Sequence, residues 1–304
     1  MLEIAIMIEG QNGLNWARWQ KLARLVEELG FAGLFRSDHF TNANPPDLDS
    51  LELWTSLTWL ADHTSRIEFG PMVTPFSFRH PVHTARMALA VDDLSGGRLV
   101  LGLGGGWQER EHHLFGFDLL DMKPRFDRFE EGMEVVTRLL QRDEPVAFDG
   151  KYYQLRGARL LPRPQRPGGP RILIGGNGGR RTLSLAMRYA SEWNCNFITM
   201  QQFSEMNGRL TEMLIHAGRN PDSVRRSLMT GCVFGKDDAA LKEKIAARRR
   251  TFDELRQRGI VVGNASQVRE QLQEMEQAGL QRVLLQWLDL DDLAGLEALA
   301  KAVL

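Results

Sequence analysis

Short apolar segments, separated by amphipathic stretches, recur along almost the whole of this 304-residue chain. The apolar segments have little polar alternation, which is typical of strands in a parallel sheet that helices cover on both faces. The stretches between them repeat apolar residues at helical spacing. The expected strands are Leu2–Ile8, Ala32–Phe35, Ile67–Gly70, Leu99–Leu103, Ile172–Ile174, Trp193–Ile198, Leu228–Phe234 and Val283–Gln286.

Eight strands that alternate with helices predict an α/β fold of the (β/α)8 TIM-barrel type. The alternative is an open doubly wound sheet, which usually has fewer strands and a glycine-rich turn after the first one. Here the first strand is followed by Glu9-Gly10-Gln11-Asn12-Gly13, which does not match G-x-G-x-x-G. We therefore expect a barrel, whose helices include Trp16–Leu29, Pro81–Leu94 and an arginine-rich helix at 241–255.

One segment, at about 143–170, breaks this alternation between the fourth and the fifth strand. Its first part, Val146–Leu155, is predicted to form a small hairpin that turns at Asp149-Gly150. The prolines and glycines that follow, up to Pro170, indicate an extended connector. We interpret the segment as an insertion in a single barrel domain of residues 1–304.

The charge balance argues against a nucleic-acid partner. The chain has 38 Lys and Arg against 39 Asp and Glu, and its one dense basic cluster, Arg248-Arg249-Arg250, is typical of a solvated helix face. No apolar stretch approaches the roughly 20 residues of a membrane helix, and a signal-peptide pattern is absent. The two cysteines, Cys195 and Cys232, indicate neither a disulfide framework nor a zinc motif, so we expect a cytoplasmic protein.

The helix expected to begin at Leu51 is rich in aromatic residues, with Trp54 and Trp59. Such a face serves either a dimer interface or the packing of the core, and the sequence does not choose between the two. We expect a homodimer.

In barrel enzymes the catalytic residues lie at the C-terminal ends of the strands. The sharpest motif at such a position is a glycine-rich turn with two arginines, which follows the fifth strand and opens a helix. Glycines let backbone N–H groups converge on an anion, and the helix N-terminus and the guanidinium groups add positive charge. We predict a phosphate site here, the alternative being a flexible turn with solvated arginines. Its residues are Gly175, Gly176, Asn177, Gly178, Gly179, Arg180 and Arg181.

A second glycine cluster, Gly104-Gly105-Gly106, ends the fourth strand. Either the close approach of a flat ring or tight packing between strand and helix accounts for it. Asp38 and His39 follow the second strand, and an imidazole there can exchange a proton near neutral pH, or serve only as a structural hydrogen-bonding group. Neighbouring side chains on an extended backbone point in opposite directions, so these two need not touch.

The segment Glu109–His113 holds two glutamates and two histidines, which raises the question of a metal site. Glu109 and His113 are four residues apart and can chelate from one helix, but no third ligand is spaced nearby and H-E-x-x-H is absent. We therefore expect no metal and interpret these side chains as solvated or capping.

Jointly, these motifs resemble the luciferase-like monooxygenase superfamily, and most of all its branch that uses the deazaflavin coenzyme F-420. The resemblance covers nearly the whole chain. Its motifs are specific for the family when taken together, and none is specific by itself. It is carried by Arg36–Phe40, Arg79–Pro81 with Leu94–Arg98, Gly102–Trp107 with Glu109–His112, and Ile172–Thr182 with Glu192–Asn194.

The resemblance implies a barrel with an insertion after strand four, a phosphate held after strand five, and hydride exchange between F-420 and a small organic substrate. It places Met72 and Val73 at a bulged strand end, where a non-proline cis peptide often supports the deazaflavin ring. It also implies that Asp38 and His39 lie at the reactive edge of that ring, and that Gly104–Gly106 line it.

The chain departs from the family pattern at one place. In the sugar-phosphate dehydrogenases of this branch a catalytic glutamate follows the glycine run, whereas here Trp107 stands there and Glu109 comes two residues later. Sugar-phosphate oxidation is therefore disfavoured. The alternative activity is that of an FMN-dependent monooxygenase on the same fold, because F-420 lacks the ring nitrogen on which oxygen activation by FMN depends.

Overall fold

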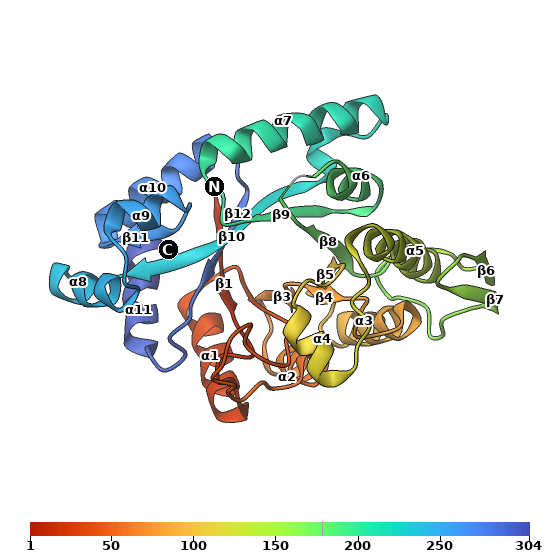
Figure 1. Cartoon of the computed structure of the whole chain (residues 1–304), viewed down its shortest axis with the longest axis horizontal. Coiled ribbons are helices and arrows are strands. Elements are labelled where there is room, and N and C mark those ends of the chain that lie inside the picture. The colour runs from red at the N-terminus through yellow and green to blue at the C-terminus, as the bar shows by residue number, and fades with distance from the viewer. Residues whose placement is uncertain (178) are drawn as a thin grey trace.

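The computed structural model describes residues 1–177 and 179–304, and within them parallel strands form a nearly closed ring surrounded by helices (Figure 1). The strands of the ring are β1 (Glu3–Ile8), β2 (Gly33–Arg36), β3 (Glu68–Pro71), β4 (Thr74–Pro75), β5 (Val100–Gly104), β8 (Arg171–Gly175), β9 (Glu192–Asn196), β10 (Arg225–Phe234) and β12 (Arg282–Gln286). Their order is β3-β2-β1-β12-β10-β9-β8-β5-β4. A bridge between Phe69 of β3 and Leu99, which directly precedes β5, closes the ring. The predicted α/β barrel is thus confirmed, with β3 and β4 as two parts of its third strand.

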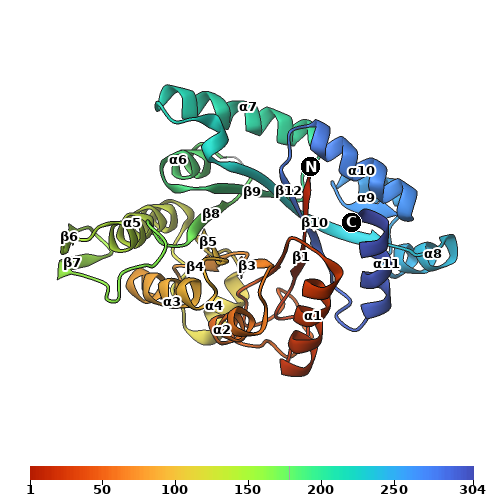
Figure 2. The ribbon, with the colours of Figure 1, turned by 180° about the vertical axis from the view of Figure 1, so that it is seen from behind.

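Helices cover the outside of the ring on all sides, as the view from behind also shows (Figure 2). They are α1 (Trp16–Leu29), α2 (Leu53–His63), α3 (Pro81–Leu94), α4 (Glu109–Phe115), α5 (Met122–Gln141), α6 (Arg180–Tyr189), α7 (Met200–His216), α8 (Asp238–Ala247), α9 (Phe252–Gln257), α10 (Ala265–Gln277) and α11 (Leu293–Val303), with a 3-10 turn at Pro221–Ser223. Among the described residues, no helix combines the length and the apolar character needed to cross a bilayer.

The first strand shows why the chain folds with two apolar layers. Ile4, Ile6 and Ile8 of β1 pack into the large core between the strands and the helices. Ala5 and Met7, which alternate with them, point to the other face and pack inside the barrel. Both faces of the strand are therefore buried, as its unbroken apolar run predicts.

A buried ionic cluster closes the end of the barrel at which the strands begin. Arg282, only 1% exposed, contacts the carboxylates of Glu3, Glu68 and Glu192, each at the start of its strand. A buried guanidinium needs such partners, because removing a charge from water is costly. This end is filled by the cluster, so an accessible site lies at the opposite end.

The insertion after the fourth barrel strand has the predicted form. Strands β6 (Val146–Asp149) and β7 (Gln154–Ala158) pair antiparallel outside the barrel, beyond α5. Gly150 closes the turn by donating its N–H to the carbonyl of Tyr153, at 3.0 Å. Glu131 of α5 accepts the N–H of Tyr152 at 2.7 Å, which ties the hairpin to that helix.

The prediction of one helix at 241–255 is wrong. Helix α8 ends at Ala247 with Arg248 as its C-cap, Arg249 adopts a left-handed backbone with φ of 51°, and α9 starts anew. The start of α9 is fixed by a capping box in which the side chains of Thr251 and Glu254 each bond the other's backbone N–H. A further short strand, β11 (Val261–Gly263), extends the pairing of β10 and was not predicted.

Candidate active site

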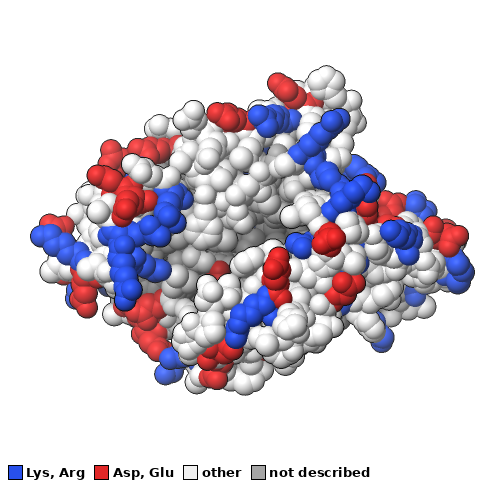
Figure 3. All heavy atoms as spheres, viewed as in Figure 1, with Lys and Arg blue, Asp and Glu red and all other residues white. Residues whose placement is uncertain are grey.

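A cavity of about 640 Å³ opens where the barrel strands end. In the space-filling view it is the hollow near the middle of the face, lined mainly by uncharged atoms (Figure 3). Its walls include Glu9 and Gln11 after β1, Ser37, Asp38 and His39 after β2, Met72 and Val73 between β3 and β4, Gly104, Gly105, Gly106, Trp107 and Gln108 from β5 onward, Gly175 and Gly176 at the end of β8, Asn194 and Asn196 of β9, and Met229 of β10.

The third barrel strand is interrupted at the cavity. The peptide bond between Met72 and Val73 is cis, as the family resemblance implied. Val73 packs so closely on the next strand that a Cβ at Gly104 would lie 2.5 Å from its Cγ2 atom. The sequence left open a flat ring or packing between strand and helix for the Gly104-Gly105-Gly106 run; at Gly104 the close neighbour is instead Val73, beside the adjoining strand β4.

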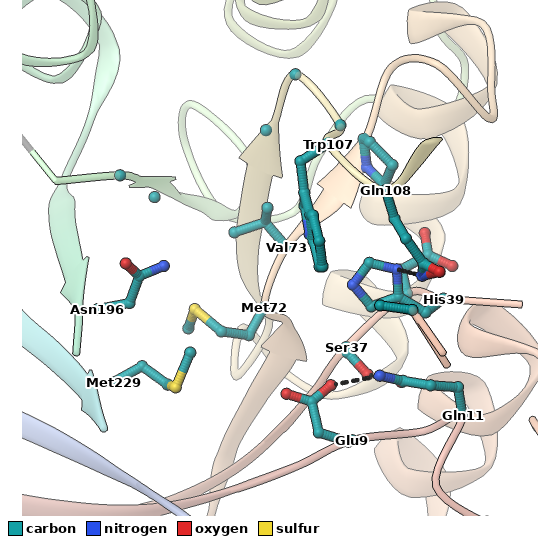
Figure 4. Close-up of a pocket in the computed structure, with 18 of the residues that line it drawn as sticks. Glu9, Gln11, Ser37, His39, Met72, Val73, Trp107, Gln108, Asn196 and Met229 are labelled. Atoms are coloured by element: carbon teal, nitrogen blue, oxygen red, sulfur yellow. Dashed lines mark hydrogen bonds between the residues drawn. The ribbon is translucent and has the colours of Figure 1, made fainter. Parts of the chain in front are cut away.

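His39 extends its ring into the cavity, beside Trp107 (Figure 4). Its Nδ1 atom lies 2.7 Å from Oε1 of Glu111, a carboxylate on α4 that is only 1% exposed. The other carboxylate oxygen of Glu111 accepts the backbone N–H of Phe40 at 2.9 Å. Since Nδ1 is engaged by a carboxylate, Nε2 is the ring atom available to the cavity.

Burial by itself lowers the pKa of His39, because it disfavours the charged ring. The hydrogen bond and the charge of Glu111, together with the charges of Glu9 and Asp38, outweigh burial and hold the pKa of His39 above its ordinary value. The structure therefore provides a protonatable ring at the cavity wall, which favours the functional over the structural interpretation of His39.

Asp38 turns away from its neighbour, as expected for an extended backbone. Its carboxylate accepts a hydrogen bond from Oγ1 of Thr74 at 2.6 Å and forms an ion pair with Arg79. Arg79 in turn contacts Glu52 at the start of α2. Asp38 thus ties β2 to β4 and α2, while His39 points to α4.

A polar chain forms another wall of the cavity (Figure 4). Gln11 and Gln286 donate their side-chain N–H groups to the two carboxylate oxygens of Glu9, at 2.9 and 2.6 Å. Ser37 donates to Oε1 of Gln11 at 2.6 Å, which fixes the orientation of that amide. Sequence reasoning gave no role to Glu9. Its interpretation of Glu111 and His112 as solvated or capping is wrong, because both are buried, and Glu111 bonds His39 and Phe40, partners that it meets only in the folded barrel.

The glycine-rich turn after β8 is only partly at the cavity. Gly175 and Gly176 line it. The side chain of Asn177 is directed to β9, where it bonds the backbone N–H and carbonyl of Asn196 at 2.8 Å each. Gly178 lies outside the described residues.

The rest of the predicted phosphate site surrounds the start of α6. Gly179 occupies the N-cap position, and no side chain caps the helix there among the described residues. Arg181 pairs with Asp127 and stacks over the ring of Phe126 at 5.2 Å, so its charge is already partly neutralised. Arg180 is exposed and, like Arg181, does not line the main cavity.

The histidines of α4 are arranged as structural groups. His112 is buried, with Nε2 at 2.8 Å from Oγ of Ser77 and Nδ1 at 2.7 Å from the carbonyl of Gln108. Glu109 and His113 are exposed on the outside of the helix. Within the described part of the chain, no group of three or more His, Cys, Asp or Glu side chains is arranged to hold a metal ion.

Comparison with known proteins decides the family. The sequence profile described as "Luciferase-like monooxygenase" matches residues 3–255. The chain belongs to the luciferase-like monooxygenase family. The barrel mouth described above is therefore the mouth of a luciferase-like barrel, whose third strand is interrupted in this chain at the cis peptide between Met72 and Val73.

Three curated relatives of this luciferase-like protein carry different activities in their names. A 4-hydroxyprotoasukamycin monooxygenase of Streptomyces nodosus subsp. asukaensis is 31% identical over 59% of this chain and 47% of its own length. An F-420-dependent glucose-6-phosphate dehydrogenase of Kineococcus radiotolerans is 29% identical over 72% and 64%. An F-420-dependent hydroxymycolic acid dehydrogenase of Mycobacterium tuberculosis is 28% identical over 72% and 60%. The matched part thus spans about half to two thirds of each relative.

Solved structures agree with the fold of the family. An F-420-dependent secondary alcohol dehydrogenase superimposes with a TM-score of 0.86 at 16% identity, over 99% of this chain and 98% of that one. A coenzyme F-420-dependent tetrahydromethanopterin reductase of Methanopyrus kandleri gives 0.78 at 21% identity, also over 99% and 98%. At these identities the likeness establishes the barrel fold alone.

Proposed function

We propose that this protein is an oxidoreductase that exchanges a hydride between coenzyme F-420 and a small organic substrate. The observation that carries the proposal is His39, whose Nδ1 lies 2.7 Å from the buried carboxylate of Glu111 and which faces the same cavity as Val73. The F-420-dependent dehydrogenases among the curated relatives support it.

The residues at the barrel mouth fit a flat ring with an anionic tail. Met7, Met72 and Met229 give the cavity an apolar floor, and Val73 projects beside them. Gly175 and Gly176 lead from this floor toward the start of α6, where the uncapped backbone N–H groups suit an anion. Met72, Val73 and Gly104–Gly106 would hold the ring, and Gly175–Arg181 would hold the phosphate. When bound, F-420 supplies a carbon that accepts or donates the hydride.

The role proposed for His39 is to hold a proton at Nε2 and exchange it with the substrate. Glu111 stabilises the imidazolium, and its double hydrogen bonding to Nδ1 and to Phe40 keeps the ring in place. Asp38, paired with Arg79, acts as a positioning residue that fixes β2 against β4. Trp107 lies edge-on to the ring of His39 at the cavity wall, with 5.6 Å between the ring centroids.

The alternative is an FMN-dependent monooxygenase, which the match to a monooxygenase relative favours. Titration of the purified protein with F-420 and with FMN, followed by fluorescence, separates the two. The proposal predicts saturable binding of F-420 and no oxygen uptake with reduced FMN. Tight FMN binding with oxygen uptake would replace it by the alternative.

The same titration tests the phosphate site. Replacing Arg180 and Arg181 by Ala should weaken F-420 binding more than it lowers turnover at saturation, because these side chains lie away from the cavity. Unchanged affinity would remove the two arginines from the site and leave only the N-terminus of α6 as its candidate.

We also propose a cytoplasmic homodimer. Cys195 and Cys232 are both buried and unpaired, in keeping with a reducing compartment. An apolar groove between α2 and α3, which includes Trp54, Trp59 and Leu94, offers a surface for a second copy. Light scattering on the wild type and on Leu94→Glu tests this, with a dimer expected for the first and a monomer for the second.

A further inference from the structure

The cavity has an electrostatic feature that the proposed activity does not require. Within the described residues, no lysine or arginine lines it. Its negatively charged side chains are Glu9, Asp38 and Glu111, and His39 adds a positive charge when it is protonated.

Two of the three carboxylates are neutralised by partners of their own. Asp38 pairs with Arg79, which is shared with Glu52 on α2. Glu111 pairs with His39. Each of these carboxylates is therefore part of a local ion pair and adds little net field to the cavity.

Glu9 differs from them, because among the described residues its hydrogen-bond partners are both neutral amides. Gln11 donates to one oxygen at 2.9 Å and Gln286 to the other at 2.6 Å. A carboxylate has about four acceptor positions, so two donors leave part of its capacity open. Arg36 of β2 is engaged elsewhere, with the carbonyl of Leu51 and the hydroxyl of Ser56.

The amides that hold Glu9 cannot turn to neutralise it further. Oε1 of Gln11 accepts from Ser37, whose hydroxyl oxygen accepts the backbone N–H of Gly10 at 2.8 Å. This relay fixes the amide with its N–H toward Glu9, so the carboxylate is held in one orientation at the cavity wall (Figure 4).

A second acceptor in the same cavity lacks a donor. Gln108 is 3% exposed, and its Nε2 donates to the carbonyl of Thr41 at 3.0 Å. Its buried Oε1 atom has no hydrogen-bond partner among the described residues. Buried acceptors are normally satisfied, so this orphaned oxygen marks a shortage of N–H donors around the cavity, whereas the acceptor that lines the cavity and that a ligand can reach is Glu9.

We infer that the substrate side of this cavity selects an organic cation with N–H donors, such as an ammonium, amidinium or protonated imine, and that Glu9 is the residue that determines this selectivity. A charged donor would form a charge-assisted hydrogen bond with Glu9, whereas a phosphate or carboxylate would meet the like charge of Glu9, and protonated His39 is already paired with Glu111. The inference extends the proposed function by naming its substrate class, but the charge preference itself does not depend on the coenzyme.

Three nearly isosteric planar probes test the inference: benzamidine as the cation, benzamide as the neutral form and benzoate as the anion. Binding of each to the full chain without coenzyme is measured by NMR titration at pH 7.5. We expect benzamidine to bind at least about tenfold more tightly than benzoate, with benzamide in between. Benzoate binding as tight as benzamidine, or tighter, would overturn the inference.

The variant Glu9→Gln keeps the size of the side chain and should lose the preference for benzamidine over benzamide. Glu109→Gln is the matched control, because Glu109 is an exposed carboxylate outside the cavity. A preference that survives Glu9→Gln, or that disappears equally in Glu109→Gln, would overturn the assignment to Glu9. If Glu9→Gln still binds benzamide, its cavity is intact. If this binding is lost, the inference is judged by whether the wild type binds benzamidine more tightly than benzoate.

Titration with F-420 separates this inference from the proposed function. A protein that binds benzamidine selectively but not F-420 would refute the function and leave the cation site standing. A protein that binds F-420 but prefers benzoate would refute the cation site and leave the proposed function standing.

Discussion

The packing of Val73 on Gly104 gives a prediction that joins the fold to the site. In the variant Gly104→Ala the new Cβ would lie 2.5 Å from Cγ2 of Val73, about 1 Å closer than carbon atoms normally approach. Val73 has little room to move toward β8, because its other methyl group is already close to Gly175 there. A Cβ built on Gly175 would lie only 3.2 Å from Cγ1 of Val73. The side chain must therefore shift toward the cavity.

Overpacking of this kind costs about 1–3 kcal/mol of unfolding free energy. Urea denaturation measures that cost, and fluorescence titration measures the accompanying loss of F-420 affinity as Val73 moves into the ring site. The double variant Val73→Ala with Gly104→Ala removes the clash, so it should recover much of the stability lost by Gly104→Ala. Gly208→Ala is the control: nothing lies within 4 Å of a Cβ there, and alanine in a helix should add about 0.5–1 kcal/mol.

The two single changes should therefore be coupled by about 1 kcal/mol or more. If the effects of Val73→Ala and Gly104→Ala simply add, within about 0.5 kcal/mol, the two residues do not meet as described and the reasoning fails.

Further predictions concern the two ends of the barrel. Glu111→Gln should lower the pKa of His39, since burial then acts with less opposition; a histidine NMR titration that does not move would contradict the pairing. Because the pKa of His39 is raised in the folded state, its contribution to stability is complete below the unfolded value of about 6.5 and is lost as the pH rises through the folded pKa. Urea midpoints across that range should show the loss in the wild type and less of it in Glu111→Gln. Arg282→Ala removes the buried cation that three carboxylates share and, although Arg225 still contacts all three, should cost about 3 kcal/mol in urea denaturation; a loss below about 1 kcal/mol would mean that Arg282 does not dominate the cluster.

Much of the barrel could be predicted from the sequence, because strands that are buried on both faces appear as unbroken apolar runs. The bounds predicted for Trp16–Leu29 and Pro81–Leu94 match α1 and α3, since a helix-stopping glycine and an early proline mark their ends. The helix at 241–255 was mispredicted because the apolar residues on either side of 248–251 keep helical spacing, as in Leu241, Ile245, Phe252 and Leu255. The pair Thr251 and Glu254, spaced as a capping box, was the signal that a new helix begins.

The site was less predictable than the fold. The position of His39 at the mouth follows from the strand order, but its partner Glu111 lies 72 residues away on a short helix whose direction no local pattern determines. Glu9 likewise depends on Gln286, 277 residues away, which becomes its neighbour only when β1 and β12 pair. The reason for Gly104, contact with Val73, also becomes visible only when β4 and β5 are side by side.

The central claim is that the cavity at the barrel mouth holds the ring of F-420 between Val73 and His39. A crystal structure of the protein grown with F-420 tests it most directly. We predict electron density for the ring against Val73, with Nε2 of His39 toward its reactive edge and the phosphate at the N-terminus of α6. Density for the coenzyme outside this cavity, or a cavity that stays empty at saturating F-420, would contradict the account.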